Sequence, residues 1–115
     1  MTIEAKATGG EAFVDVIAVS ELPPDAQKTV FVGTTRVLLC NTDKGLFALE
    51  DKCTHALQPL AGGEIEDGII TCPKHGACFD LVTGKPTNNL SKRPVKVFEL
   101  RVCDGRIQIN PAPRA

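Results

Sequence analysis

Two short stretches, Cys53-Thr-His55 and Cys72-Pro-Lys-His-Gly-Ala-Cys-Phe-Asp80, contain both histidines of the chain, each shortly after a cysteine. Sixteen residues separate His55 from Cys72. Each stretch follows an apolar run typical of a strand, and two loops joined by a hairpin return to the same end of a sheet. Thiolates and imidazoles are ligands of soft and borderline metals. The sequence therefore predicts one metal centre with Cys53, His55, Cys72 and His75 as its ligands.

Short apolar runs broken by turn residues, about every 8–12 positions, surround these stretches and indicate an all-β chain. Asp67-Gly68 and Asp104-Gly105 each stand between apolar residues, a strong signal of a type I′ hairpin turn. Residues 51–63 and 73–89 do not have the pattern of strands and are expected to be loops that carry the metal ligands. Strands are expected at residues 13–19, 29–32, 36–41, 46–50, 95–103 and 106–110, and a hairpin is expected within residues 64–71.

The composition is that of a globular domain, with 115 residues, 43% of them hydrophobic and 23% charged, and a formal net charge of −1. We expect one domain over residues 1–115, with its core at about 12–110 and its metal-binding part at about 51–89. The balance of charges argues against nucleic-acid binding. No apolar run approaches the ~18 residues that a membrane-spanning helix needs. The start lacks a secretory signal, so we expect a cytoplasmic location, where five cysteines serve as ligands or core residues rather than disulfides.

The pattern Cys53-x-His55 and Cys72-x-x-His75 resembles the motif of Rieske proteins, whose cysteines bind one iron of a [2Fe–2S] cluster and whose histidines bind the other. The stretch from Cys72 to Asp80, followed by Thr83-Gly-Lys85, is similar to the second cluster loop of ferredoxins from bacterial aromatic-ring dioxygenases. This resemblance implies an antiparallel β-sandwich with a small cluster-binding subdomain formed by two loops. Neutral imidazoles in place of two thiolates raise the reduction potential into a range of roughly −150 to +300 mV.

Four positions indicate which kind of Rieske protein the chain resembles. Respiratory and photosynthetic members have two further cysteines, which by resemblance would stand at Gln58 and Lys74, so their disulfide is excluded here. Those members also have a Ser and a Tyr that donate hydrogen bonds to the cluster, where this chain has Ala77 and Phe79. Because fewer donors stabilise the added electron less, we expect a potential near the low end of the range.

The resemblance implies a soluble one-electron carrier rather than an enzyme. Its expected partners are a flavin-containing ferredoxin reductase as donor and a terminal, aromatic-ring-hydroxylating oxygenase as acceptor. Both histidines are used by the cluster, so the usual two-histidine iron site of a terminal oxygenase cannot be built from this chain. We expect a monomer that binds neither nucleic acid nor a membrane. The oxygenase's substrate, the reductase's identity and the exact potential do not follow from the sequence.

Three other functions are compatible with parts of the pattern. The small subunits of bacterial nitrite reductases have Rieske-like folds of similar length, although they often lack the full ligand set. Two cysteines and two histidines can also hold zinc in a binding module, but zinc sites usually pair Cys with Cys and His with His. A thiol enzyme would use a single Cys–His pair and leave the second pair unexplained.

The remaining cysteines are expected to have no role in the metal centre. Cys40 and Cys103 fall at the ends of apolar strands and are predicted to be buried packing residues. Cys78 lies three residues after His75 and is predicted to be an inert packing residue, with a redox-responsive thiol as the alternative.

Lys74 lies within the second motif, where dioxygenase ferredoxins commonly have a large apolar residue. Lys92, Arg93 and Lys96 extend this basic character if the chain there passes the metal centre. A local group of positive charges on a near-neutral protein can direct transient docking.

Overall fold

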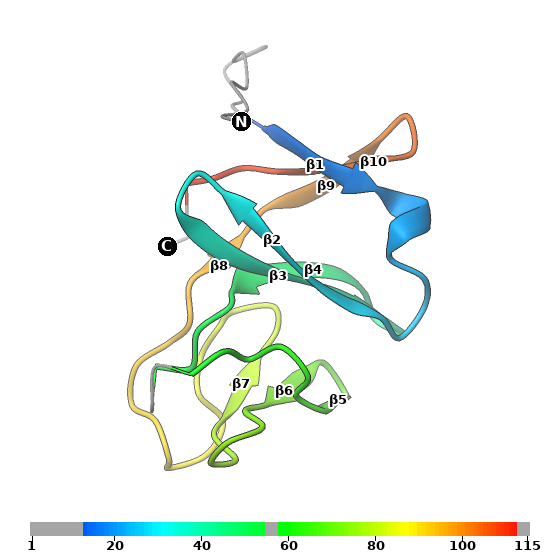
Figure 1. Ribbon diagram of the computed structural model, residues 1–115. Helices are drawn as coiled ribbons and strands as arrows, with labels where there is room; N and C mark the ends of the chain where they lie inside the picture. The colour runs from blue at the N-terminus through cyan, green and yellow to red at the C-terminus, as the bar shows by residue number, and fades with distance from the viewer. Residues whose placement is uncertain (1–12, 55–57, 113–115) are drawn as a thin grey trace.

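Three antiparallel sheets form the part of the chain that this computed structural model describes, residues 13–54 and 58–112 (Figure 1). The middle sheet contains, in spatial order, β2 (Gln27–Val32), β3 (Thr35–Thr42), β4 (Gly45–Glu50) and β8 (Val97–Phe98). The second sheet contains β1 (Val14–Ala18), β10 (Arg106–Ile109) and β9 (Leu100–Cys103), and the third contains β5 (Ile65–Glu66), β6 (Ile69–Thr71) and β7 (Cys78–Asp80). One 3-10 turn (Val19–Glu21) is the only helical element in the described residues, none of which form a helix that could cross a bilayer. The predicted all-β fold is confirmed.

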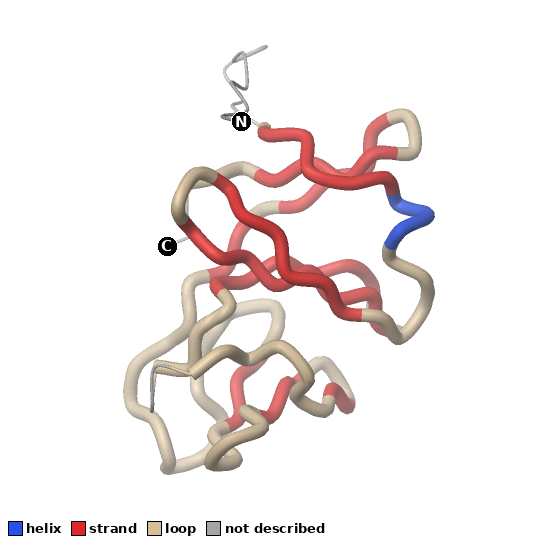
Figure 2. The backbone as a smooth tube through the Cα atoms, viewed as in Figure 1, coloured by secondary structure: helices blue, strands red, loops and turns tan. Residues whose placement is uncertain are grey.

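The middle sheet is covered on both faces, and β3 shows how the sequence achieves this. Its residues Val37, Leu38, Leu39 and Cys40 are all almost completely buried. Side chains alternate between the faces of a strand, so Val37 and Leu39 pack with the β1–β10–β9 sheet. Leu38 and Cys40 pack on the opposite face, in the cluster that contains the third sheet. This continuous apolar run therefore joins the sandwich to the smaller, loop-rich part of the chain, which is tan for most of its length in Figure 2.

The two predicted hairpin turns are confirmed by their backbone geometry. Asp67 and Gly68 have φ of 54° and 74°, and Asp104 and Gly105 have φ of 52° and 76°. Positive φ at both central residues is the requirement of a type I′ turn. The pairing agrees, because Glu66 lies opposite Ile69 and Cys103 lies opposite Arg106.

The structure corrects two of the expected strand boundaries. The single strand expected at 95–103 is divided at Glu99 into β8, which pairs with β4, and β9, which pairs with β10. The chain thus passes from one sheet to the other, with Val97 and Phe98 buried in different clusters. The loop expected at 73–89 contains a short strand, β7, because its residues complete the sheet begun by the Asp67-Gly68 hairpin.

The prediction that Cys103 is buried is wrong. Cys103, expected to be buried, is exposed because it is the last residue of β9, beside the Asp104-Gly105 turn, where no other layer covers it. Cys40 is buried as predicted.

A salt bridge between Asp15 and Arg106 joins β1 to β10, with Arg106 Nη2 2.7 Å and Nε 3.1 Å from Asp15 Oδ2. The hydrogen bond from Arg106 lowers the pKa of Asp15 below its usual value. A carboxyl with a depressed folded-state pKa stabilises the fold above its unfolded pKa of about 3.9, and this stabilisation is lost as pH falls through the folded pKa.

We therefore expect Asp15→Asn to lower the melting temperature at pH 7 by a few degrees at most, since both side chains are more than a third exposed. The difference from wild type should vanish at a pH below the folded pKa of Asp15. Thermal unfolding between pH 2 and 7 measures this, with the exposed Asp43→Asn as a control. A difference that persisted unchanged at low pH would contradict the role given to the charge.

Candidate metal centre

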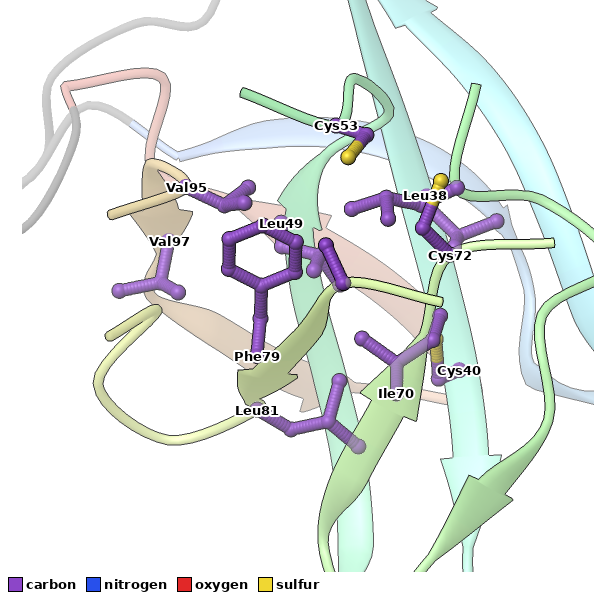
Figure 3. Close-up of a cluster of buried hydrophobic side chains, with 12 residues drawn as sticks. Leu38, Cys40, Leu49, Cys53, Ile70, Cys72, Phe79, Leu81, Val95 and Val97 are labelled. Carbon is purple, nitrogen blue, oxygen red and sulfur yellow. The ribbon is translucent and has the colours of Figure 1, made fainter. Parts of the chain in front are cut away.

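Cys53 and Cys72 reach the same buried region from two different loops. Cys53 follows β4 and is 0% exposed, and Cys72 directly follows β6 and is 1% exposed. Both belong to the cluster of Leu38, Leu49 and Phe79, and Figure 3 shows both side chains at the same end of it. Neither cysteine is in a disulfide. Two thiols from separate loops, embedded in apolar side chains, are suited to holding a metal from the inside of the protein.

The two loops are closed by equivalent backbone hydrogen bonds. The Cys53 N–H donates to Gln58 O at 2.6 Å, and the Cys72 N–H donates to Ala77 O at 2.7 Å, five residues further along in each case. In the second loop Gly76 has φ of 81°, and its N–H donates to Cys72 O at 3.0 Å. Each predicted Cys/His pair thus belongs to a loop that turns back at the same distance from its cysteine.

His75 lies at the surface, whereas the cysteine that begins its loop is buried. The fourth predicted ligand, His55, is outside the described residues. Within residues 13–54 and 58–112 no three or more Cys, His, Asp or Glu side chains form a metal-binding group. What the described residues provide is two buried thiols and one imidazole at the surface of the same region. This donor set fits a centre that takes sulfur ligands from inside and nitrogen ligands from the solvent side.

A third segment, residues 88–93, holds the two loops in place. Thr54 Oγ1 is 2.6 Å from Ser91 Oγ and donates to Arg93 O at 2.7 Å. Asn88 Nδ2 donates to Gly76 O at 3.0 Å in the second loop. The contribution of Thr54, Ser91 and Asn88 was not found from the sequence, because isolated polar residues in loops give no periodic signal.

The buried carboxylate of Asp51 fixes both ends of the first loop. Its Oδ1 accepts hydrogen bonds from the backbone N–H groups of Leu60 and Ala61, at 2.8 and 2.9 Å. Its Oδ2 accepts bonds of 2.9 Å from Thr29 Oγ1 and Arg36 Nη2, on β2 and β3. The Asp51 side chain is 0% exposed, whereas that of its partner Arg36 is 46% exposed. Sequence reasoning missed Asp51, whose only signal is an acidic side chain directly after an apolar strand.

The other two cysteines near the centre are not placed as ligands by the structure. Burial, together with the nearby charge of Asp51, raises the pKa of the Cys40 thiol to about 12, so it stays protonated and unreactive at neutral pH. Cys78 is half-buried, and its Sγ lies 3.3 Å from Thr71 Oγ1 and 3.4 Å from Gly76 O. These contacts agree with a packing role for Cys78.

Comparison with known proteins gives one family. The family described as "Rieske [2Fe-2S] domain" matches residues 12–99. The 3-phenylpropionate/cinnamic acid dioxygenase ferredoxin subunit of Photorhabdus laumondii is 35% identical over 95 residues, covering 82% of this chain and 90% of the relative. The anthranilate 1,2-dioxygenase ferredoxin subunit of Burkholderia cepacia is 31% identical over 93 residues, covering 81% and 86%. A chain in the solved complex of reduced oxygenase and oxidized ferredoxin in carbazole 1,9a-dioxygenase superposes with a TM-score of 0.81 at 29% identity, covering 90% of this chain and 96% of the other.

We expect Asp51→Asn to destabilise the fold by about 1–3 kcal/mol, because the asparagine amide has one oxygen where the carboxylate has two and cannot accept all four hydrogen bonds. Urea unfolding of the loaded protein measures this. The matched control is Asp43→Asn at an exposed position, for which less than about 0.5 kcal/mol is expected. Equal effects of the two substitutions would show that Asp51 does not anchor the loop.

Proposed function

This chain belongs to the Rieske [2Fe-2S] domain family, and we propose that it carries single electrons from a flavin-containing ferredoxin reductase to a terminal, aromatic-ring-hydroxylating oxygenase. Its cofactor is one Rieske-type [2Fe–2S] cluster. The observation that carries the proposal is the arrangement of the donors, with Cys53 and Cys72 buried and His75 at the surface. When bound, the cluster supplies a site that takes up and releases one electron without making or breaking a bond to a substrate.

We assign the ligands as the sequence predicts them. Cys53 and Cys72 would hold one iron of the cluster, and His55 and His75 would hold the other. The support is the shared burial of the two cysteines, the matching closure of their loops and the surface position of His75. The assignment of His55 rests on the sequence motif.

The residues around the proposed centre give it an apolar side at the cysteines and a solvent-exposed side at His75. Leu38, Leu49 and Phe79 pack around the cysteines and exclude water from the sulfur side. His75 is exposed, so as a ligand it would give electrons a short route between the cluster and the surface. We infer that both partners use this side in turn.

The similarities favour the function of a ferredoxin over the alternative functions. The relatives that share 31–35% identity over most of this chain are named as ferredoxin subunits of dioxygenase systems, which are electron carriers and not the catalytic component. A nitrite reductase subunit, a zinc module or a thiol enzyme is not favoured by these similarities. We further propose a cytoplasmic monomer whose single domain covers residues 1–115, with its core at about 12–110 and the cluster-binding part at about 51–89.

Two substitutions, one at His75 and one at Cys78, test whether His75 is a ligand of the cluster. We expect His75→Ala to lose the cluster or its characteristic spectrum, because one iron loses a nitrogen ligand. Cys78→Ser, three residues away, should keep the spectrum and two irons per chain, because a serine hydroxyl can replace the hydrogen bonds of the Cys78 thiol with Thr71 and Gly76. Iron analysis and the EPR spectrum of the reduced proteins provide the readouts. An unchanged spectrum in His75→Ala would refute the ligand assignment.

The same two variants test the function. With NADH, a flavin-containing ferredoxin reductase and a terminal oxygenase, wild type and Cys78→Ser should support turnover, and His75→Ala should not. A wild-type protein that is loaded with its cluster but is neither reduced by the reductase nor reoxidised by the oxygenase would contradict the proposed role.

A further inference from the structure

The three chain segments at the metal centre have positive side chains and, among their described residues, no negative ones. We call the described residues of the three converging segments, 53–54, 58, 72–77 and 88–94, the tip. The only Lys, Arg, Asp and Glu residues in the tip are Lys74, Lys92 and Arg93, all of them exposed. None of the three forms an ion pair with a described carboxylate. The tip is therefore a cationic surface around the imidazole of His75.

Hydrogen bonds between the segments show that these cations share one surface. Arg93 Nη2 donates to Thr54 O at 3.4 Å, and Thr54 Oγ1 donates to Arg93 O, which joins the third segment to the first loop. Asn88 Nδ2 donates to Gly76 O, which joins the third segment to the second loop beside Lys74. Arg93 therefore lies against the first loop, with Lys92 next to it in the chain, and Lys74 lies within the second loop.

Leu90 adds an apolar contact to the same surface. It is 44% exposed, and its Cδ1 lies 3.8 Å from the position that a Cβ on Gly76 would take, next to His75. Leu90 exposes apolar surface to water beside the proposed electron exit, and a partner that covers this surface gains free energy of binding from its burial. An exposed apolar residue inside a polar rim is the usual composition of a protein interface.

The positive charge of the tip does not reflect an excess over the whole molecule. The chain has 13 Lys and Arg against 14 Asp and Glu. Carboxylates gather elsewhere, for example Asp25, Asp43 and Glu64 around a hollow between the β3–β4 turn and the segment that leads into β5. Separated charges of this kind orient a protein as it approaches a charged partner.

We propose that the chain docks tip first onto a carboxylate-rich surface of its redox partner protein, with Leu90 entering an apolar recess close to the partner's own redox centre. This inference rests on the proposed function and specifies the partner's chemistry. Complementary charges of this kind raise the association rate by about 10–10³-fold and lose their effect as salt increases. A small, partly polar contact also allows the rapid release that a shuttle between two partners requires.

The first experiment probes the electrostatic field near His75, the proposed electron exit, with two small oxidants of opposite charge. The loaded, reduced protein is mixed with ferricyanide, a trianion, or with hexaammineruthenium(III), a trication, each of which accepts one electron from the cluster. At 0.1 M ionic strength the Debye length is about 10 Å, so only charges near the exit affect the rate. The double variant Lys74→Glu/Lys92→Glu should slow ferricyanide about tenfold and accelerate the ruthenium complex.

A matched control carries charge reversals of the same kind away from the tip. Lys28 on β2 and Lys44 in the β3–β4 turn are exposed and lie in the middle sheet. Lys28→Glu/Lys44→Glu should change both rates less than twofold. The reduction potential of each variant is measured so that a change in driving force is not mistaken for a change in field. Equal effects of the two double variants would overturn the proposal.

The second experiment has a readout independent of electron transfer. A carbodiimide joins lysine amines to carboxylates only where they are in contact, and an N-acetylated hexaglutamate peptide serves as the carboxylate-rich probe. Mass spectrometry of the loaded protein should find cross-links at Lys74 and Lys92 well above those at Lys28 and Lys44, and the difference should disappear in 0.5 M salt. Uniform labelling of exposed lysines would overturn the docking surface while leaving the proposed function standing. Tip-selective labelling of a protein that shuttles no electrons would instead refute the function alone.

Discussion

The buried carboxylate of Asp51 is the interaction on which the arrangement of the metal centre depends. The Asp51 side chain is buried and accepts hydrogen bonds from four donors, two on the middle sheet and two at the end of the first loop. A buried charge with all its partners in place is tolerated, whereas removing one partner leaves an uncompensated charge that costs several kcal/mol. The first loop is therefore fixed to the sandwich at a point two residues before Cys53.

The middle sheet extends this constraint to the second loop. Leu38 and Cys40 on one face of β3 pack in the same cluster as Cys53 and Cys72, while Val37 and Leu39 on the other face pack against the sheet of β1, β10 and β9. Both cysteine loops thus rest on one rigid support. Segment 88–93 then joins the two loops from outside through its hydrogen bonds to Thr54 and Gly76.

Local features were predictable from the sequence, and long-range ones were not. The Asp67-Gly68 and Asp104-Gly105 turns follow from the φ values that only a few residue types adopt readily, and the ligand motifs follow from spacing. The change of sheet at Glu99 and the exposure of Cys103 depend on which layer covers which strand, information that an apolar run does not contain. The bonds of Asp51 and the Thr54–Ser91 contact join residues far apart in the chain, so no local pattern indicates them. The place of His55 remains a prediction of the motif.

The reduction potential, followed by EPR during a potentiometric titration of the loaded protein, tests the central claim most directly. Ala77 and Phe79 are buried beside the cysteine loops and have no side-chain donor that would stabilise an added electron. We predict a Rieske-type signal that appears on reduction with a midpoint near the low end of the family's range, about −150 mV. A midpoint near +300 mV would contradict the assignment to an oxygenase system, and a colourless protein that contains zinc and gives no signal would contradict electron transfer itself.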